Sequence, residues 1–313
     1  PISFYCPSAK RYKILLEAGA FPSDQYAVES QVRFHGFEPE EAILEMKARA
    51  GEDTLRTEDI LHTIEQQADS LALVLFPGVQ YYSGQLFDME RITAAAHRAG
   101  AKAGFDLAHA VGNVPLRLHD WNVDFAVWCS YKYLNAGPGN NGGAFVHERY
   151  AEAHDLPRFA GWWGHDESER FQMQKGFKPM YGVDGWQLSN VNILSTAVQR
   201  ASLEMIAEAG MDQLRAKSIR LTAFLEECIL SLDPEGRQIR IITPRDSEAR
   251  GCQLSMLSAS HGRQLFKQLT EAGIVVDWRE PDVIRVAPTP LYNTFEEVYR
   301  FYEILKNTLD ASR

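Results

Sequence analysis

The sequence is poor in cysteine. It has four cysteines in 313 residues, and none of them forms a Cys-x-x-Cys pair or a Cys/His spacing typical of zinc ligands. This argues against a disulfide framework and a metal site and favours a reducing compartment, so we predict a cytoplasmic protein without a bound metal. Most of the cysteines stand beside apolar or aromatic residues, so we expect small buried side chains. They are Cys6, Cys129, Cys228 and Cys252.

An excess of positive charge and long apolar runs are also missing. Lys and Arg number 32 against 42 Asp and Glu, which gives a net charge of −10, so we expect no nucleic-acid partner. No run reaches the roughly 18 to 20 apolar residues that cross a bilayer, and the first residues lack the architecture of a signal peptide, so we expect no membrane partner. The chain begins at Pro1 and not at Met, as expected of a fragment. If it is a fragment, any targeting segment would lie upstream of Pro1.

The first part of the chain alternates between apolar strands and helices. Ser23 is the expected cap of the first helix and Gly36 its stop. Such alternation is typical of a mainly parallel sheet with helices on both faces, and such sheets bind ligands at the carboxyl ends of their strands. The predicted strands cover 11–20, 70–79, 102–106 and 123–129, and the predicted helices cover 23–35, 57–68 and 88–99.

The pattern changes after residue 190. Residues 193–232 are strongly helical, with a bend expected near Gly210, and short strands then alternate with two helices. We predict a large domain in residues 1–194 and a smaller α+β domain in residues 195–313. The short strands are IRIITP, CQLSML and IRVAP, and the helices are HGRQLFKQLTEAG and TFEEVYRFYEILKNTL.

Two ionisable residues stand at the ends of neighbouring predicted strands. Asp106 ends one strand, with His109 three residues later, and Lys132 follows the next. A buried lysine without a partner is costly, so it must pair, reach solvent or give up its charge. A lysine and a carboxylate so placed suit pyridoxal phosphate: the lysine bonds the cofactor and the carboxylate keeps its ring nitrogen protonated. Taken alone, such a pair is more often a surface ion pair.

Longer stretches around these residues carry a family resemblance. FDLAHAVGN (105–113), LHDWNVDFAVWCSYKYLNAGPG (118–139) and RVAPTPLYN (285–293), together with FPSDQYAVES, GWWGH and QLSN, resemble kynureninases along essentially the whole chain. Kynureninases are pyridoxal-phosphate enzymes of the fold-type I aminotransferase superfamily. Cysteine desulfurases are similar in the Asp and Lys layout, but they usually have His before the lysine, where this chain has Tyr131. The resemblance implies a mainly parallel large domain with helices on both faces and a smaller C-terminal α+β domain.

The resemblance also implies roles for residues around the cofactor ring. Lys132 would be the Schiff-base lysine and proton shuttle, Asp106 the partner of the pyridinium nitrogen, and His109 a neighbour of the ring. Phe21 would stack on the ring. The cofactor-binding stretch that starts at Phe21 also includes Pro22, Ser23 and Asp24.

Further roles lie at the rim of the implied site. Tyr82 and Tyr131 would reach the phosphate, and Tyr82 is also our candidate for protonating the alanine product. Trp162 and Asn190 would complete the pocket at a subunit interface. Arg285 would hold the substrate α-carboxylate, because a planar guanidinium can bind a carboxylate through two hydrogen bonds.

The chain departs from the family in two ways. Pro77 takes the place of a serine that can bond the cofactor phosphate, and proline lacks both the hydroxyl and the backbone donor. Kynureninases also have a long N-terminal stretch with a phosphate-gripping loop, before the point at which this chain begins. The resemblance therefore leaves open a catalytically incomplete, truncated domain, for which we predict little activity.

Each candidate also has an ordinary structural explanation. Phe21 could be a core aromatic and His109 a hydrogen-bonded core histidine. Arg285 could form a salt bridge with Asp282 or Glu280. Tyr82, Tyr131 and Trp162 could equally be strand-end or packing residues.

The function implied by the resemblance is hydrolytic cleavage of L-kynurenine or 3-hydroxy-L-kynurenine, in tryptophan catabolism and NAD biosynthesis. The products would be L-alanine and anthranilate or its 3-hydroxy form, and the sequence leaves the choice of substrate open. The implied assembly is a homodimer with shared active sites. The enzymatic alternative is another fold-type I enzyme such as a cysteine desulfurase, which would need a reactive thiol on a mobile loop.

Overall fold

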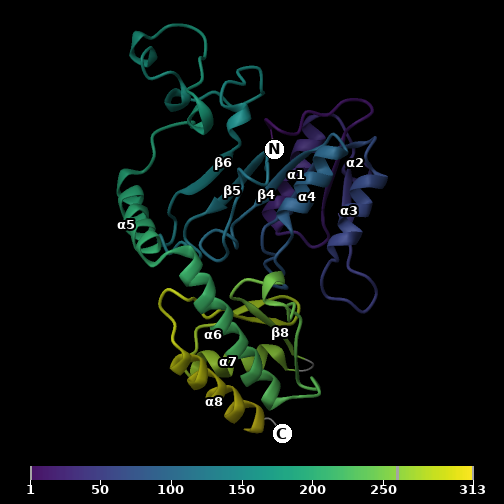
Figure 1. Cartoon of the computed structure of the whole chain (residues 1–313), viewed down its shortest axis with the longest axis vertical. Helices are drawn as coiled ribbons and strands as arrows, with labels where there is room; N and C mark the ends of the chain where they lie inside the picture. Colours follow the sequence, from purple (N-terminus) through teal and green to yellow (C-terminus); the bar gives the residue numbers. More distant parts are fainter. Residues whose placement is uncertain (1, 259–260, 312–313) are drawn as a thin grey trace.

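A six-stranded sheet organises the first half of the chain (Figure 1). The computed structural model describes residues 2–258 and 261–311. The strand order is β2-β1-β3-β4-β5-β6, in which the first five strands are parallel and β6 is antiparallel to β5. The mainly parallel sheet predicted for the large domain is therefore confirmed. The strands are β1 (Lys13–Glu17), β2 (Ile43–Met46), β3 (Leu71–Pro77), β4 (Lys102–Asp106), β5 (Phe125–Cys129) and β6 (Gly142–Val146).

Helices cover both faces of this sheet, as expected. Neighbouring residues of a strand point to opposite faces, so Leu15 packs in one hydrophobic core and Ile14 in the other. The first core contains α3 (Thr57–Gln66) and α4 (Met89–Arg98). The second contains α1 (Pro22–Phe34) and the short α2 (Pro39–Ala42).

The ends of α1 correct one prediction and support another. Ser23 is not the cap: the helix begins at Pro22 with Phe21 as the N-cap residue, because proline's fixed φ suits the first turn. Gly36 ends it as expected, with a φ of +79° just after the C-cap residue His35.

The second half of the chain forms a smaller sheet with its own core. Its strands are antiparallel in the order β7-β8-β10-β9, and its core includes Leu221, Met256 and Leu305. The long helical stretch breaks at Gly210, as predicted, because this residue takes a φ of +76°. The elements are α5 (Ile193–Ala209), α6 (Met211–Leu232), β7 (Ile239–Ile241), β8 (Leu254–Ser258), α7 (Gly262–Glu271), β9 (Asp277–Arg279), β10 (Val283–Val286) and α8 (Phe295–Ala311).

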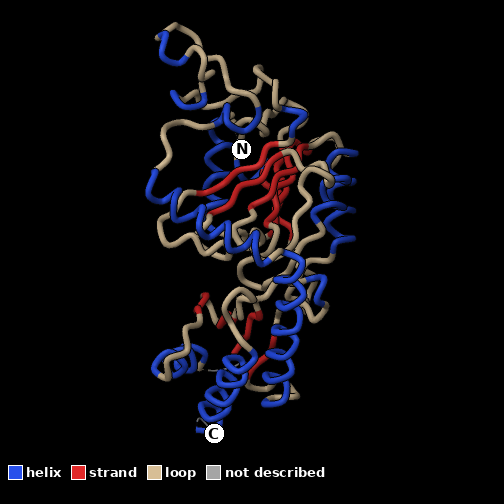
Figure 2. The backbone as a smooth tube through the Cα atoms, turned by 60° about the vertical axis from the view of Figure 1, so that its left-hand side comes forward, coloured by secondary structure: helices blue, strands red, loops and turns tan. Residues whose placement is uncertain are grey.

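Residues 147–192 lead from β6 to α5 and project beyond the sheet, on the side away from the small sheet (Figures 1 and 2). Only short 3-10 helices form here, among them Trp162–Gly164 and Gly182–Trp186. Among residues 2–258 and 261–311, further 3-10 helices are Glu148–Tyr150, Arg170–Gln172 and Ser247–Ala249. Among the described residues, no helix is long and apolar enough to cross a membrane.

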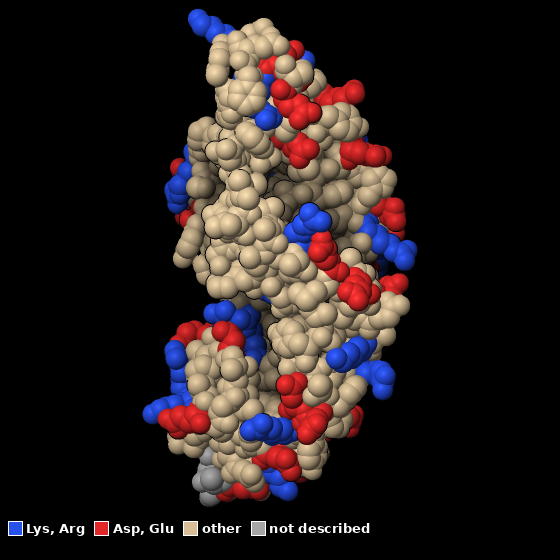
Figure 3. Space-filling view, turned by 90° about the vertical axis from the view of Figure 1, so that its left-hand side faces the viewer, with Lys and Arg blue, Asp and Glu red and all other residues tan. Residues whose placement is uncertain are grey.

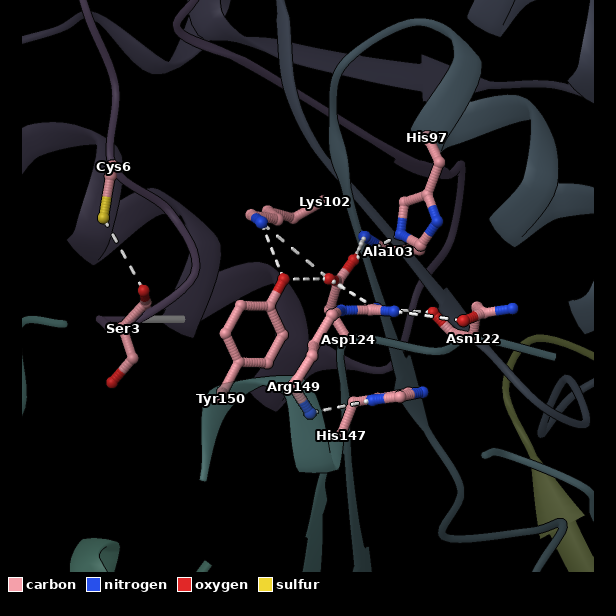
Figure 4. A network of polar contacts seen from close by, with 10 residues as sticks. All are labelled: Ser3, Cys6, His97, Lys102, Ala103, Asn122, Asp124, His147, Arg149 and Tyr150. Carbon is pink, nitrogen blue, oxygen red and sulfur yellow. Dashed lines mark hydrogen bonds and ion pairs between the residues drawn. The ribbon is translucent and has the colours of Figure 1, made fainter. Parts of the chain in front are cut away.

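One buried carboxylate, Asp124, joins the amino ends of β4 and β5 (Figure 4). It accepts a hydrogen bond from the Ala103 N–H at 2.7 Å and from Arg149 Nη2 at 2.8 Å, it lies 2.8 Å from His97 Nε2, and the Tyr150 hydroxyl also donates to it. Burial alone would raise the pKa of Asp124, but these hydrogen bonds outweigh it and lower the pKa to about 2. Asp124 is therefore a fully bonded structural anion.

The cysteines are all free, but they are not all buried. Cys228 and Cys252 are buried, Cys129 is partly buried, and Cys6 is exposed. The expectation of a buried side chain is wrong for Cys6, because it lies in the coil before β1 and not in a packed element.

Candidate functional site

The candidate residues meet at the carboxyl ends of the parallel strands. Asp106 is the last residue of β4 and is paired in register with Pro77, the last residue of β3. Lys132 follows β5, and its Nζ lies 5.7 Å from the centre of the Phe21 ring, just before α1. The fold thus brings together residues from three loops, at the edge of the sheet where ligands of such folds bind.

Carboxyl groups accumulate at this edge. Burial, the charge of Asp106 and a hydrogen bond to that carboxylate raise the pKa of Asp24 to about 7, whereas Lys132 acts in the opposite direction. Burial and the charges of Asp24 and Asp106 also raise the pKa of Glu17, at the end of β1, well above its ordinary value. Three carboxyls thus lie close to one another, with Lys132 near Asp24, and an additional proton-bearing cationic group would be stabilised there.

His109 lies beside this cluster as a neutral imidazole. Burial, followed by the positive charges of Lys132, Arg285 and Arg279, lowers the pKa of His109 to about 2. Its Nδ1 is buried and has no hydrogen-bond partner among the described residues. Buried polar atoms are nearly always bonded, so this ring nitrogen suits contact with a bound polar group.

Arg285 is held at the same place from the small sheet. Its Nε donates to Asp277 Oδ2 at 2.7 Å, its Nη2 forms an ion pair with the same oxygen, and its Nη1 donates to the Tyr81 carbonyl at 2.7 Å. The salt bridge with Asp282 or Glu280 considered from the sequence is wrong, because β9 pairs with β10 and places Asp277 opposite Arg285. Three of the five N–H groups of the guanidinium are used, and two remain for a ligand carboxylate.

The two tyrosines lie at different distances from the core of the site. The Tyr82 hydroxyl donates to Asp282 at 2.8 Å, and burial followed by this hydrogen bond raises the pKa of Tyr82 well above its ordinary value. Tyr131 is 49% exposed, and a hydrogen bond with Cys129 raises its pKa. Its ring centre is 5.9 Å from Lys132 Nζ, so it borders the site.

Trp162 and Asn190 lie apart from this cluster. Both are exposed and belong to the projecting residues 147–192, and the Trp162 ring packs edge-on against Phe171 at 5.8 Å. No hydrogen bond or ring contact within the described residues joins either of them to Lys132 or Asp106. Their expected place at a subunit interface stays a prediction.

Sequence reasoning missed four residues that shape the site, namely Glu17, Asn113, Tyr133 and Cys252. Glu17 carries the same signal as Asp106, an acidic residue at the carboxyl end of an apolar strand. The others are identified only by contacts between segments far apart in the sequence, such as the hydrogen bond from the Cys252 N–H to Asn113.

Comparisons with known proteins agree on one family. The family model described as the kynureninase C-terminal domain matches residues 214–305. The chain is 57% identical to a kynureninase of Flavobacterium psychrophilum over 97% of its own length and 72% of that protein, and 59% identical to a kynureninase of Myxococcus xanthus over 97% and 71%.

Solved structures share the fold at low identity. A cysteine desulfurase of Thermococcus onnurineus matches 96% of this chain and 74% of its own with a TM-score of 0.75 and 17% identity. A C-DES mutant with glycine covalently linked to its pyridoxal-phosphate cofactor matches 98% of this chain and 77% of its own, with a TM-score of 0.78 and 16% identity. At such identities the likeness concerns the fold, which is that of fold-type I pyridoxal-phosphate enzymes as predicted.

Proposed function

Because the chain belongs to the kynureninase family, we propose that it is a pyridoxal-phosphate enzyme that hydrolyses L-kynurenine or 3-hydroxy-L-kynurenine. The products are L-alanine and anthranilate or 3-hydroxyanthranilate, as in tryptophan catabolism and NAD biosynthesis. The observation that carries the proposal is the 57% identity to a kynureninase over 97% of the chain. Cytoplasmic location, inferred from the cysteine pattern, is part of the proposal.

The residues of the site fit the cofactor. Lys132 would hold it covalently, Phe21 would stack on its ring, and Asp106 would face its ring nitrogen. The excess of carboxyls around Lys132 supports a protonated ring nitrogen at this place, and the unpartnered Nδ1 of His109 supports a polar group beside it. Bound there, pyridoxal phosphate supplies an electron-accepting ring that stabilises negative charge at the substrate α-carbon.

The phosphate end of the cofactor would lie near the loops that follow β3 and β5. Tyr82 and Tyr131 are the proposed hydroxyl donors, and Pro77 offers no donor at the position where many kynureninases have serine. Pro22 and Ser23 would take part through the first turn of α1, where Ser23 would supply its N–H and hydroxyl as donors to an anion and Pro22 would set the start of the helix.

Each of three side chains would then have a separate role in the reaction. Lys132 Nζ, as a neutral amine, would take the proton from the substrate α-carbon. The two free N–H groups of Arg285 would bind the α-carboxylate and fix the orientation of the substrate. Water adds to the γ-carbonyl carbon, the Cβ–Cγ bond breaks, and the electron pair of that bond takes up a proton at Cβ. Tyr82 is the candidate donor of that proton, because its phenol is protonated at neutral pH.

Exposed apolar side chains support a homodimer with shared active sites. Figure 3 shows the side of the molecule that bears α5, and a wide part of this face carries no charged side chains. Exposed apolar side chains are typical of protein interfaces when they lie close together. In α5 and in residues 147–192 before it, the exposed apolar residues include Phe159, Phe171, Ile193, Leu194 and Val198.

The cysteines favour this reaction over the desulfurase alternative. A desulfurase needs a nucleophilic thiolate, and thiolates require a lowered pKa. Burial instead raises the pKa of the two buried thiols, Cys228 and Cys252.

Substrate choice tests the proposal directly. The chain is loaded with pyridoxal phosphate and offered L-kynurenine or L-cysteine, and anthranilate fluorescence and sulfide release are measured. We expect anthranilate from kynurenine only at the low rate predicted from the sequence, no sulfide from cysteine, and neither product with Lys132→Ala. Sulfide without anthranilate would favour the desulfurase alternative, and cofactor binding without either product would favour the incomplete domain.

A further inference from the structure

The small sheet contacts three of the loops that carry the candidate site, those after β3, β4 and β5. Thr243 Oγ1 donates to the Ser83 carbonyl at 2.6 Å, and Gln253 Nε2 donates to the Tyr81 carbonyl at 3.2 Å, so the loop after β3 is held. The loops after β4 and β5 are both held by one residue, Cys252, which is 0% exposed. The segment before β8 is therefore the common support of these loops.

Asn113 makes the link between Cys252 and the loop after β4. Its Nδ2 donates to the His109 carbonyl at 2.9 Å, and its Oδ1 accepts from the Cys252 N–H at 3.0 Å. These opposite roles fix the orientation of the amide. The side chain is 2% exposed, and a Cβ atom on Gly251 would lie 2.3 Å from its Nδ2, so the backbone before Cys252 packs directly on it.

Tyr133 makes the link between Cys252 and the loop after β5. Tyr133 and the Cys252 thiol affect each other's pKa, and the Tyr133 ring lies 6.1 Å from the His109 ring. A Cβ atom on Gly112 would lie 2.8 Å from the Tyr133 carbonyl oxygen, so the loops after β4 and β5 also contact each other through their backbones. Gly112 has a φ of +76°, which favours glycine for a second reason.

We propose that Asn113 is a positioning residue for the kynurenine reaction: by joining the His109 carbonyl to the Cys252 amide, it holds the His109 ring in its buried place beside Lys132. The small sheet thereby sets the geometry of the site through a residue that touches neither the cofactor nor the substrate. This inference rests on the proposed function only for its effect on turnover. Its effect on His109 is independent of the reaction.

The titration of His109 gives a readout that a merely structural role would not change. The side chains that face His109 from other elements and affect its pKa are Lys132, Arg279 and Arg285, with Tyr133 against its ring. In the chain without cofactor, histidine NMR signals are followed from about pH 5 to pH 8, the range in which an ordinary histidine titrates. His109 is assigned by its loss in His109→Gln. We expect no titration of His109 in the original protein.

Asn113→Leu is the decisive variant, because leucine has a similar size and makes neither hydrogen bond. We expect the loop to loosen, water to reach the ring and the midpoint of His109 to enter the measured range. With cofactor bound, kcat for kynurenine should fall by about tenfold to a hundredfold, because small displacements of catalytic groups cost that much, while KM changes less. If Asn113→Leu does not fold, Asn113→Ala replaces it, since it leaves room for water.

Gln85→Met is the matched control. Gln85 is a buried amide that also makes two backbone hydrogen bonds, accepting from the Leu55 N–H at 3.0 Å and donating to the Leu55 carbonyl at 2.6 Å. The Gln85→Met variant should be less stable than the original protein, but the titration of His109 should not change. An unchanged His109 titration and kcat in both Asn113 variants would overturn the inference. Absence of kynurenine cleavage by the original protein would overturn the proposed function instead and would leave the titration result standing.

Discussion

The two ends of the large sheet hold buried carboxylates in opposite conditions. At the amino ends, Asp124 is bonded by donors from several elements, and its pKa is lowered to about 2. At the carboxyl ends, Asp24 and Asp106 share one hydrogen bond between two acids, and the pKa of Asp24 is raised to about 7. His109 beside them has a buried nitrogen with no partner in the described part of the chain.

The amino ends of the sheet therefore contribute to stability, whereas the carboxyl ends contribute to ligand binding. A carboxylate with all its hydrogen bonds made within the chain stabilises the fold and has no capacity left for a ligand. A cluster with surplus charge and an unbonded ring nitrogen is costly to the folded chain and becomes favourable only when a complementary group binds. Substitutions at the two ends should therefore affect different measurements.

The largest effect on turnover is expected from substitutions in a pair of lysines, one at each end of the large sheet. Lys132→Ala should lower kynurenine cleavage at least about a thousandfold, as loss of a covalent catalytic group does, and change the free energy of unfolding by less than about 1 kcal/mol. Lys102 lies 3.9 Å from Asp124 and donates to the Tyr150 hydroxyl at 2.6 Å, and Lys102→Ala should leave turnover unchanged. Equal loss of turnover in both variants would contradict the assignment of catalysis to the carboxyl ends of the sheet.

A pair of aspartates, one at each end of the large sheet, should separate loss of stability from loss of kcat. Asp124→Asn should lower the free energy of unfolding by roughly 3 kcal/mol, because it leaves Arg149 and His97 without their buried partner, and kcat of the folded fraction should not change. Asp106→Asn should lower kcat by about a hundredfold with little loss of stability, since it relieves repulsion with Asp24. Urea unfolding and steady-state kinetics of both variants measure this. A larger stability loss in Asp106→Asn than in Asp124→Asn would be the opposite of the expected order.

Acid should weaken the amino end of the sheet first. The folded-state pKa of Asp124, about 2, lies below its ordinary value of 3.8, so its contribution is complete above pH 3.8 and is lost as the pH falls toward 2. The free energy of unfolding should fall over this range in the original protein and fall less in Asp124→Asn. Urea unfolding between about pH 5 and pH 2.5 measures both slopes, and parallel curves would show that Asp124 does not supply this dependence.

The smallest effect concerns Asp24. Its pKa of about 7 lies above the ordinary value of 3.8, so the folded chain holds the proton more tightly and loses stability as the pH rises from 3.8 through 7. Asp24→Asn should remove this loss and make the cofactor-free chain more stable at pH 8 relative to the original, with little difference at pH 4. A stability gain that is equal at both pH values would contradict the shared-proton explanation.

The sequence predicted the elements that have strong local signals. Continuous apolar runs identified β3, β4 and β5, and Gly210 identified the break between α5 and α6. Short strands without such runs were missed: β2 has only four residues, and β6 (Gly142–Val146) begins with two glycines. The boundary between residues 194 and 195 stays a prediction.

The sequence predicted those site residues whose type and position in the chain already indicate their chemistry. Asp106 and Lys132 stand at strand ends, and parallel topology then places them at one edge. The partner of Arg285 was not predictable, because Asp277 belongs to a three-residue strand whose pairing decides the contact. Asn113 and Cys252 are 139 positions apart, and nothing local links them.

The most direct test of the central claim is chemical identification of the lysine that holds the cofactor. The protein loaded with pyridoxal phosphate is reduced with borohydride and digested, and its peptides are sequenced by mass spectrometry. We predict that the cofactor mass lies on Lys132, in the peptide that contains the stretch 129–139. A cofactor on another lysine, or no retained cofactor in the reduced protein, would contradict the assignment of this edge of the sheet as the active site.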